Sequence, residues 1–174
     1  MKKSFRKNII SSLIFLLLII IIFNIANYYF RTKDPISALK FNLSSYDGPF
    51  KLKTILNTVD INSNSKFIFY QNQNNAISHA FLLKKWNRSW KVISIRGQIP
   101  MTSSNRDTSF FKHSLNYSKN KTSYIYGGIV YDKNINSIHF AGKQARIIQN
   151  KKDIRIWYLK TDENLSNYEI EIYN

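Results

Sequence analysis

The most prominent hydrophobic pattern in the sequence is an unbroken apolar run close to the amino terminus. Residues 8–30 contain no charged side chain, and fifteen of these 23 residues are Ile, Leu or Phe. As a helix, a segment of this length rises about 34 Å, which exceeds the ~30 Å hydrocarbon layer of a bilayer. A helix in the core of a soluble protein keeps a polar face, and residues 13–23 have none. The pattern predicts a transmembrane helix over residues 8–30.

Two alternatives to a permanent anchor remain, a cleaved signal peptide and a buried helix of a soluble protein. A signal peptide has a shorter apolar region that ends in a small-x-small cleavage site. Here Ala26 is preceded two positions earlier by Asn24, which makes a poor site. The aromatic residues 28–30 instead suit the interfacial belt of a membrane helix. We therefore expect an uncleaved signal anchor.

The charges that flank the apolar run predict its orientation. The short tail, residues 1–7, carries four Lys or Arg side chains. The far flank has Arg31 and Lys33, offset by Asp34. The more positive flank of a membrane helix stays in the cytoplasm. We therefore expect a single-pass protein of the cell membrane with its amino terminus in the cytoplasm. Its cytoplasmic tail is residues 1–7, and residues 31–174 are extracytoplasmic.

Shorter patterns follow the apolar run. Asp34 is a good N-cap and Pro35 fits the first position of a helix, so a short helix is predicted to start here. Short alternating runs bounded by Asn, Ser and Gly come next and predict strands. We expect residues 34–97 to form this helix packed on antiparallel strands.

The stretch "ISHAFLLKKWNRSWKVISIRG" predicts a hairpin. A register with Trp86 opposite Trp90 also places Leu83 opposite Ile93. One face of the hairpin is then apolar, as a half-buried antiparallel sheet requires.

The rest of the chain divides into two parts. Residues 98–121 are polar and irregular, which predicts a linker or a long loop. Residues 122–174 alternate apolar and polar positions, which predicts a β-rich antiparallel block. Within it, Gly127-Gly128 has no phosphate-loop motif around it and predicts a bulge or bend in a strand. Whether this block shares a core with residues 34–97 stays open.

The predicted fold class is α+β and mostly β. It consists of one N-terminal transmembrane helix, a short helix packed on antiparallel strands, and a C-terminal antiparallel β block. The chain has no cysteine, so the sequence excludes disulfides, thiolate metal sites and thiol nucleophiles.

Charge adds a possible ligand class to this fold. The chain has 26 Lys and Arg against 10 Asp and Glu, and without the four tail cations 22 basic residues remain. Such a domain is attracted to anionic lipid or to a phosphate-rich wall polymer. The cations are scattered along the sequence, so a purely compositional origin is the alternative. Nucleic acid is not expected as a partner, because no nucleic-acid fold motif is present.

Catalytic and metal-binding chemistry is weakly represented. His79, His113 and His139 lie in separate elements without metal-ligand spacing, so we expect surface or hydrogen-bonded histidines. His139 alternates with apolar neighbours, so its side chain should point away from the buried face of its strand. No cofactor or metal is expected. The scattered acids define no catalytic pair, so we do not expect an enzyme, and a cell-wall glycan hydrolase is the least favoured alternative.

The predicted hairpin tip is the best candidate for a functional surface. Its aromatic and basic side chains would contact lipid headgroups or a polymer. The simpler interpretation is a cross-strand tryptophan pair that packs on the protein beneath lysine stems. The candidate contact residues are Trp86, Trp90, Lys84, Lys85, Arg88 and Lys91.

The hairpin and the segment "YGGIVYDKNINSIHFAGKQARII" resemble parts of an uncharacterised family of small single-pass exported proteins from low-GC Gram-positive bacteria. This resemblance implies membrane anchoring and a mostly β fold, and it carries over no site residues. The order of helix and strands is also similar to cystatin-like and NTF2-like folds, as an analogy of fold only.

The sequence favours a membrane-tethered extracytoplasmic binding or scaffolding domain. The main alternative is an accessory or immunity-type subunit that binds one specific membrane or secreted protein.

Overall fold

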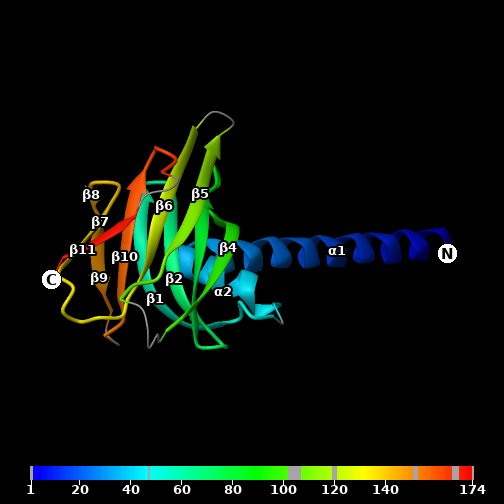
Figure 1. The fold of residues 1–174 in the computed structure, drawn as a ribbon. Coiled ribbons are helices and arrows are strands. Elements are labelled where there is room, and N and C mark those ends of the chain that lie inside the picture. Colours follow the sequence, from blue (N-terminus) through cyan, green and yellow to red (C-terminus); the bar gives the residue numbers. More distant parts are fainter. Residues whose placement is uncertain are drawn as a thin grey trace.

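The computed structural model describes residues 2–46, 48–101, 107–118, 121–150, 153–165 and 169–173. The chain is mostly β and carries two helices at its amino end, which confirms the predicted fold class. Figure 1 shows the first helix, α1, projecting from one side of a stack of β layers, with the carboxyl end on the opposite side.

Helix α1 (Lys2–Thr32) is the apolar segment. The most apolar 18-residue window within its stretch Ile10–Thr32 has a mean hydropathy of 2.5, and none of that window is buried against the protein. Among the described residues this is the one helix long and apolar enough to cross a membrane.

Helix α2 (Pro35–Ser44) begins where the sequence predicts. The Asp34 carboxylate accepts a hydrogen bond from the backbone N–H of Ser37 at 2.9 Å and so caps the first turn. Leu39 and Leu43 lie one turn apart and are fully buried. The helix therefore presents an apolar stripe to the strands that follow.

Four strands form the first sheet, sheet A, as an antiparallel meander in the order β1-β2-β3-β4. The strands are β1 (Leu52–Asn62), β2 (Ser65–Asn72), β3 (Ala76–Lys84) and β4 (Trp90–Pro100). One face packs against α2 through Ile68, Tyr70 and Leu82, which are fully buried.

A second sheet, sheet B, packs on the other face of sheet A. Its order is β5-β6-β10-β9, with β5 (Phe111–Ser118), β6 (Lys121–Val130), β10 (Arg155–Thr161) and β9 (Arg146–Gln149). Phe67 and Phe81 of sheet A share one core with Leu115 and Ile125 of sheet B. The two halves of the chain after α1 thus share a core, a point that the sequence left open.

Strand β5 corrects the prediction for residues 98–121. This segment was expected to be a linker or long loop, but β4 extends into it as far as Pro100 and β5 occupies Phe111–Ser118. Phe111, His113 and Leu115 of β5 alternate toward the shared core. The expected linker therefore contributes an edge strand, while residues 102–106 and 119–120 lie outside the described part.

A third, small sheet, sheet C, covers the outer face of sheet B. It has the order β11-β7-β8, with β7 (Ser137–Phe140), β8 (Lys143–Gln144) and β11 (Ile170–Tyr173). Ile138 and Phe140 of β7 pack against Tyr126 and Trp157 of sheet B. The part of the chain after α1 is therefore a stack of four layers in the order α2, sheet A, sheet B and sheet C.

Gly127 and Gly128 do not form the predicted bulge, since β6 pairs with β10 in unbroken register across both residues. Close approach of another segment explains them instead. A Cβ atom on Gly128 would lie 1.7 Å from the carbonyl oxygen of Ser109. That carbonyl accepts a hydrogen bond of 3.1 Å from the indole N–H of Trp157.

We expect Gly128→Ala to lower the free energy of unfolding by about 3 kcal/mol or more, because the added methyl group meets backbone that cannot move aside. Gly142→Ala is the control. Gly142 has a φ of +68° with nothing near its missing Cβ, so only about 1–2 kcal/mol of backbone strain is expected. Urea unfolding of the detergent-solubilised chain measures both values, and equal losses would contradict this explanation.

Candidate functional site

The hairpin of β3 and β4 has a different register from the predicted one. Lys84 pairs with Trp90 and Leu83 pairs with Lys91, so Trp86 is not opposite Trp90. The turn lies one residue earlier than expected, because the Lys85 N–H donates to the Ser89 carbonyl at 2.7 Å and leaves residues 86–88 at the tip. Arg88 closes this tip in a left-handed backbone conformation with φ of 63°. Its N–H bonds the carbonyl of Lys85, which closes the turn.

This register separates the two tryptophans. Trp86 lies on the turn and is 96% exposed, whereas Trp90 is 6% exposed and packs in the core between α2 and sheet A. The ammonium groups of Lys66 and Lys84 lie 5.8 and 5.9 Å from the Trp90 ring centroid. The predicted tryptophan pair is therefore wrong, and Trp90 is not part of an exposed contact surface.

The other candidate contact residues remain at the surface. The exposed set consists of Lys84, Lys85, Trp86, Arg88 and Lys91. We call this set the hairpin tip.

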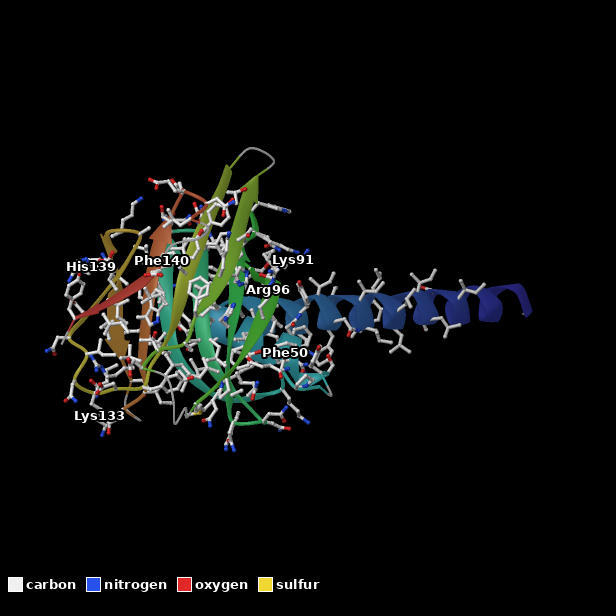
Figure 2. All side chains as sticks on the ribbon, viewed as in Figure 1. Phe50, Lys91, Arg96, Lys133, His139 and Phe140 are labelled. Atoms are coloured by element: carbon white, nitrogen blue, oxygen red, sulfur yellow. The ribbon has the colours of Figure 1, made fainter. Side chains whose placement is uncertain are left out.

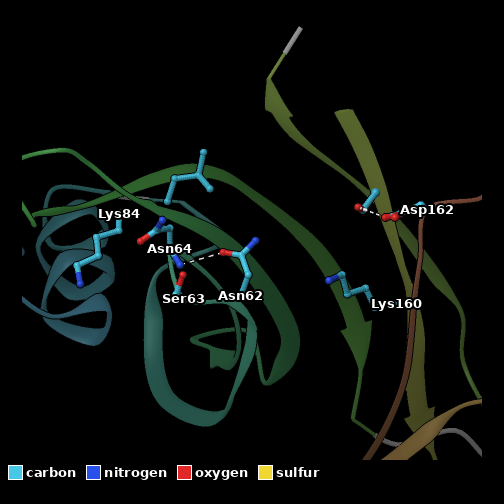
Figure 3. A pocket seen from close by; sticks show the side chains of 8 residues that line it. Asn62, Ser63, Asn64, Lys84, Lys160 and Asp162 are labelled. Carbon is cyan, nitrogen blue, oxygen red and sulfur yellow. Dashed lines mark hydrogen bonds between the residues drawn. The ribbon is translucent and has the colours of Figure 1, made fainter. Parts of the chain in front are cut away.

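A polar cleft of about 430 Å³ opens beside the hairpin, at one end of the stack of sheets A and B (Figure 3). Its walls come from the turn between β1 and β2, the end of β3, the start of β6 and the end of β10. The side chains that line it are Asn62, Ser63, Asn64, Leu83, Lys84, Ser123, Lys160 and Asp162. Since Lys84 also belongs to the hairpin tip, the cleft and the tip are continuous.

Two hydrogen bonds organise the cleft. The ammonium of Lys160, on sheet B, donates to the carbonyl oxygen of Ile61, on sheet A, at 3.1 Å. The hydroxyl of Ser123 donates to the carboxylate of Asp162. The first bond joins the two sheets. The second engages the carboxylate of Asp162, which is the single acid in the lining of the cleft.

A second depression of about 350 Å³ lies on the other side of Lys160, between β1 and the segment from β8 to β10. Its lining residues are Val59, Asp60, Ile61, Gln144, Arg146, Tyr158, Leu159 and Lys160. Asp60 forms an ion pair with Lys66, so its charge is partly compensated. We call the cleft and this depression together the edge groove.

The chemistry of the edge groove fits binding of a polar ligand. Amide, hydroxyl and ammonium groups are all present, and the cations Lys84, Lys160 and Arg146 outnumber the acids. A glycan hydrolase needs a pair of carboxylates roughly 5–10 Å apart. The two carboxylates of the groove line different depressions and are both engaged, Asp162 by Ser123 and Asp60 by Lys66. Among the described residues no group of three His, Cys, Asp or Glu side chains could hold a metal ion.

Sequence reasoning missed a pair of buried histidines. His79 on β3 and His113 on β5 are each 1% exposed, and their ring centroids are 5.0 Å apart in the core shared by sheets A and B. His113 Nε2 lies 2.7 Å from the hydroxyl oxygen of Ser94, whereas both ring nitrogens of His79 have no hydrogen-bond partner. The expectation of a surface or hydrogen-bonded histidine is therefore wrong for His79.

The backbone of β4 makes room for this pair. Gly97 has a φ of +85°, and a Cβ atom there would lie 2.9 Å from His79 Nδ1. His139 behaves as predicted, since it lies between the buried residues Ile138 and Phe140 and is itself only half-buried.

Burial determines the charge state of the pair. Desolvation, with smaller contributions from His113 and Arg96, holds the pKa of His79 well below its usual 6.5. Desolvation and Arg96 lower the pKa of His113 to about 4. Both rings are therefore neutral at pH 7.

We expect the free energy of unfolding to fall as the pH drops from 7 to 5. Below pH 6.5 the histidines of the unfolded chain take up protons that the folded chain excludes. Each buried histidine then costs about 1.4 kcal/mol per pH unit, until the pH reaches its folded pKa. Urea titrations of the solubilised chain, followed by tryptophan fluorescence, measure this slope.

The matched variants for this test are His79→Gln and His139→Gln. The first should remove about half of the slope, because one of two buried rings is gone. The second should leave the slope unchanged. A stability that stays flat between pH 7 and pH 5 in the unmodified chain would refute this assignment.

Comparison with known proteins adds no relative to this picture. No family model, no curated protein and no solved structure matches the chain significantly.

Proposed function

We propose that this chain is a single-pass membrane-tethered protein whose extracytoplasmic domain binds an anionic, phosphate-rich polymer of the cell surface without catalysis. The edge groove is the observation that carries the proposal. It consists of two depressions that share Lys160, it shares Lys84 with the hairpin tip that carries the exposed Trp86, and its cations exceed its acids.

The shape of the groove favours a polymer over a small ion. Two depressions flank the Lys160 bridge, so a chain of repeating units can occupy both and receive charge from Lys160 at the centre. Lys84 and Arg146 lie in opposite halves, which spaces the cations along the ligand. Trp86, two residues after Lys84 in the sequence, offers an exposed apolar surface for a sugar ring or a polymer backbone.

The tethered topology is part of the proposal. An apolar helix of sufficient length and four cations in residues 1–7 support a cytoplasmic tail and an exported domain. The resemblance to small anchored proteins of Gram-positive bacteria agrees with this placement.

A second candidate function has its own observation. An aromatic side chain that is 96% exposed, such as Trp86, is typical of the anchor of a protein interface. An accessory or immunity-type protein would insert this side chain into one specific membrane or secreted partner.

The polymer hypothesis predicts that the solubilised full chain is retained on cell-wall polymer carrying glycerol phosphate, in a salt-sensitive manner. Lys84→Gln combined with Lys160→Gln should weaken retention roughly tenfold, because two groove cations are lost. Lys133→Gln combined with Lys143→Gln removes the same charge outside both proposed sites and should leave retention near that of the unmodified chain.

Equal losses in both double variants would reject a specific groove and leave only general charge attraction. No retention at low salt, together with stoichiometric crosslinking of one protein through position 86 in cells, would favour the accessory-subunit function instead.

The proposed topology predicts the labelling pattern of single cysteines. The chain has no cysteine of its own, so Lys133→Cys and Lys3→Cys each introduce one thiol. In intact cells a membrane-impermeant maleimide should label Lys133→Cys and not Lys3→Cys, while the full-length chain stays in the membrane fraction. Labelling of Lys3→Cys alone, or a shortened product in the medium, would contradict the proposed anchor.

A further inference from the structure

A second candidate site lies at the elbow between α1 and α2. The two helices meet almost without a linker, and Thr32 at the joint is buried. The rings of Tyr28 and Phe41 meet edge to face at 6.2 Å, and the guanidinium of Arg31 lies 5.2 Å from the Phe41 ring centroid. These contacts hold the end of α1 against α2. In Figure 1, α1 leaves the domain beside α2.

Helix α2 has a second face besides the one that packs on sheet A. This face lies away from the buried Leu39, and its residues recur at helical spacing. They are Ser37, Lys40, Phe41 and Ser44. Between this face and the end of α1 is a pocket of about 390 Å³. The residues that line this elbow pocket are Phe30, Arg31, Ser37, Lys40, Phe41 and Ser44.

The elbow pocket has the chemistry of a phosphate site. Its lining holds two cations and no carboxylate. Among the described residues neither Arg31 nor Lys40 forms an ion pair, and Arg31 uses Nε to bond the Asn27 side chain at 2.9 Å. The nearby carboxylate of Asp34 is committed to the first turn of α2 through Ser37. An anion in the pocket would therefore meet uncompensated positive charge.

The position of the pocket identifies the source of the phosphate. Arg31 is the penultimate residue of α1 and follows its apolar stretch. Tyr28, Tyr29 and Phe30 are 44%, 44% and 63% exposed, as expected for an aromatic belt at the edge of the hydrocarbon. In an inserted helix the elbow pocket lies at the level of the lipid headgroups, with Phe30 toward the acyl chains.

We propose that the elbow pocket binds the phosphate of an anionic phospholipid, held by Arg31 and Lys40. The phosphate contacts the two cations, and the rings of Phe30 and Phe41 contact the glycerol and the upper acyl chains. This inference rests on the proposed membrane insertion of α1. It is independent of the polymer ligand, because no residue is shared with the edge groove.

Native mass spectrometry of the full chain tests this site. The chain is released from micelles that hold equal amounts of phosphatidylglycerol and phosphatidylcholine, and the retained lipids are counted. We expect preferential retention of one phosphatidylglycerol. Arg31→Gln combined with Lys40→Gln should lower that preference roughly tenfold, because both phosphate ligands lose their charge.

The control removes two cations elsewhere, by Lys133→Gln combined with Lys143→Gln. Figure 2 places Lys133 on the far side of the domain from α1. This control should keep the lipid preference, and circular dichroism checks that both double variants are folded. Lys40→Gln alone, which leaves the Arg31 contacts with Phe41 and Asn27 intact, should give an intermediate loss.

An unchanged preference in the Arg31 and Lys40 variant, or an equal loss in the control, would overturn the proposal. Complete displacement of the lipid by soluble glycerol 3-phosphate would also overturn it, by assigning the pocket to a free phosphate ligand. Lipid preference without polymer retention would support the elbow pocket and reject the polymer function, so the two proposals can fail separately.

Discussion

Burial of sheet A on both faces is the constraint on which the other elements depend. Strands β2 and β3 are buried along nearly their whole lengths, so neither face of this sheet can be left to water. Helix α2 covers one face and sheet B covers the other, with sheet C closing the outer side of sheet B. Without cysteine, these three apolar interfaces carry the cohesion of the domain.

Both proposed binding sites lie at seams of this layered arrangement. The edge groove opens where the borders of sheets A and B diverge, and the elbow pocket opens where α1 turns into α2. At a seam, backbone carbonyls and long cationic side chains reach the surface from two layers at once, as Lys160 does at Ile61. The buried faces of the layers have no such freedom, because a charge there would lose its hydration. This explains why the polar chemistry gathers at borders.

The sequence predicted correctly those structural features that depend on short stretches of the chain. The apolar helix, the Asp34 cap of α2 and the alternating strands each follow from a few neighbouring residues. The predicted hairpin register was wrong because the turn lies one residue earlier, with Arg88 in a left-handed conformation, and no residue type there signals that conformation. Strand β5 was missed because His113 occupies one of its inward positions, so its period-two alternation looked polar. The groove combines segments almost a hundred residues apart, and such pairings leave no trace in a single sequence.

The junction of the two helices also limits where the domain can work. Two residues, Lys33 and Asp34, separate α1 from α2, and ring contacts brace the joint. A domain joined to its first helix in this way cannot move away from the end of that helix, unlike one carried on a flexible stalk. In the proposed topology, its ligands must come within a single domain height of the lipid surface. Any tilt of the anchor would be transmitted directly to the strands, so bilayer thickness would set the angle at which the groove meets its surroundings.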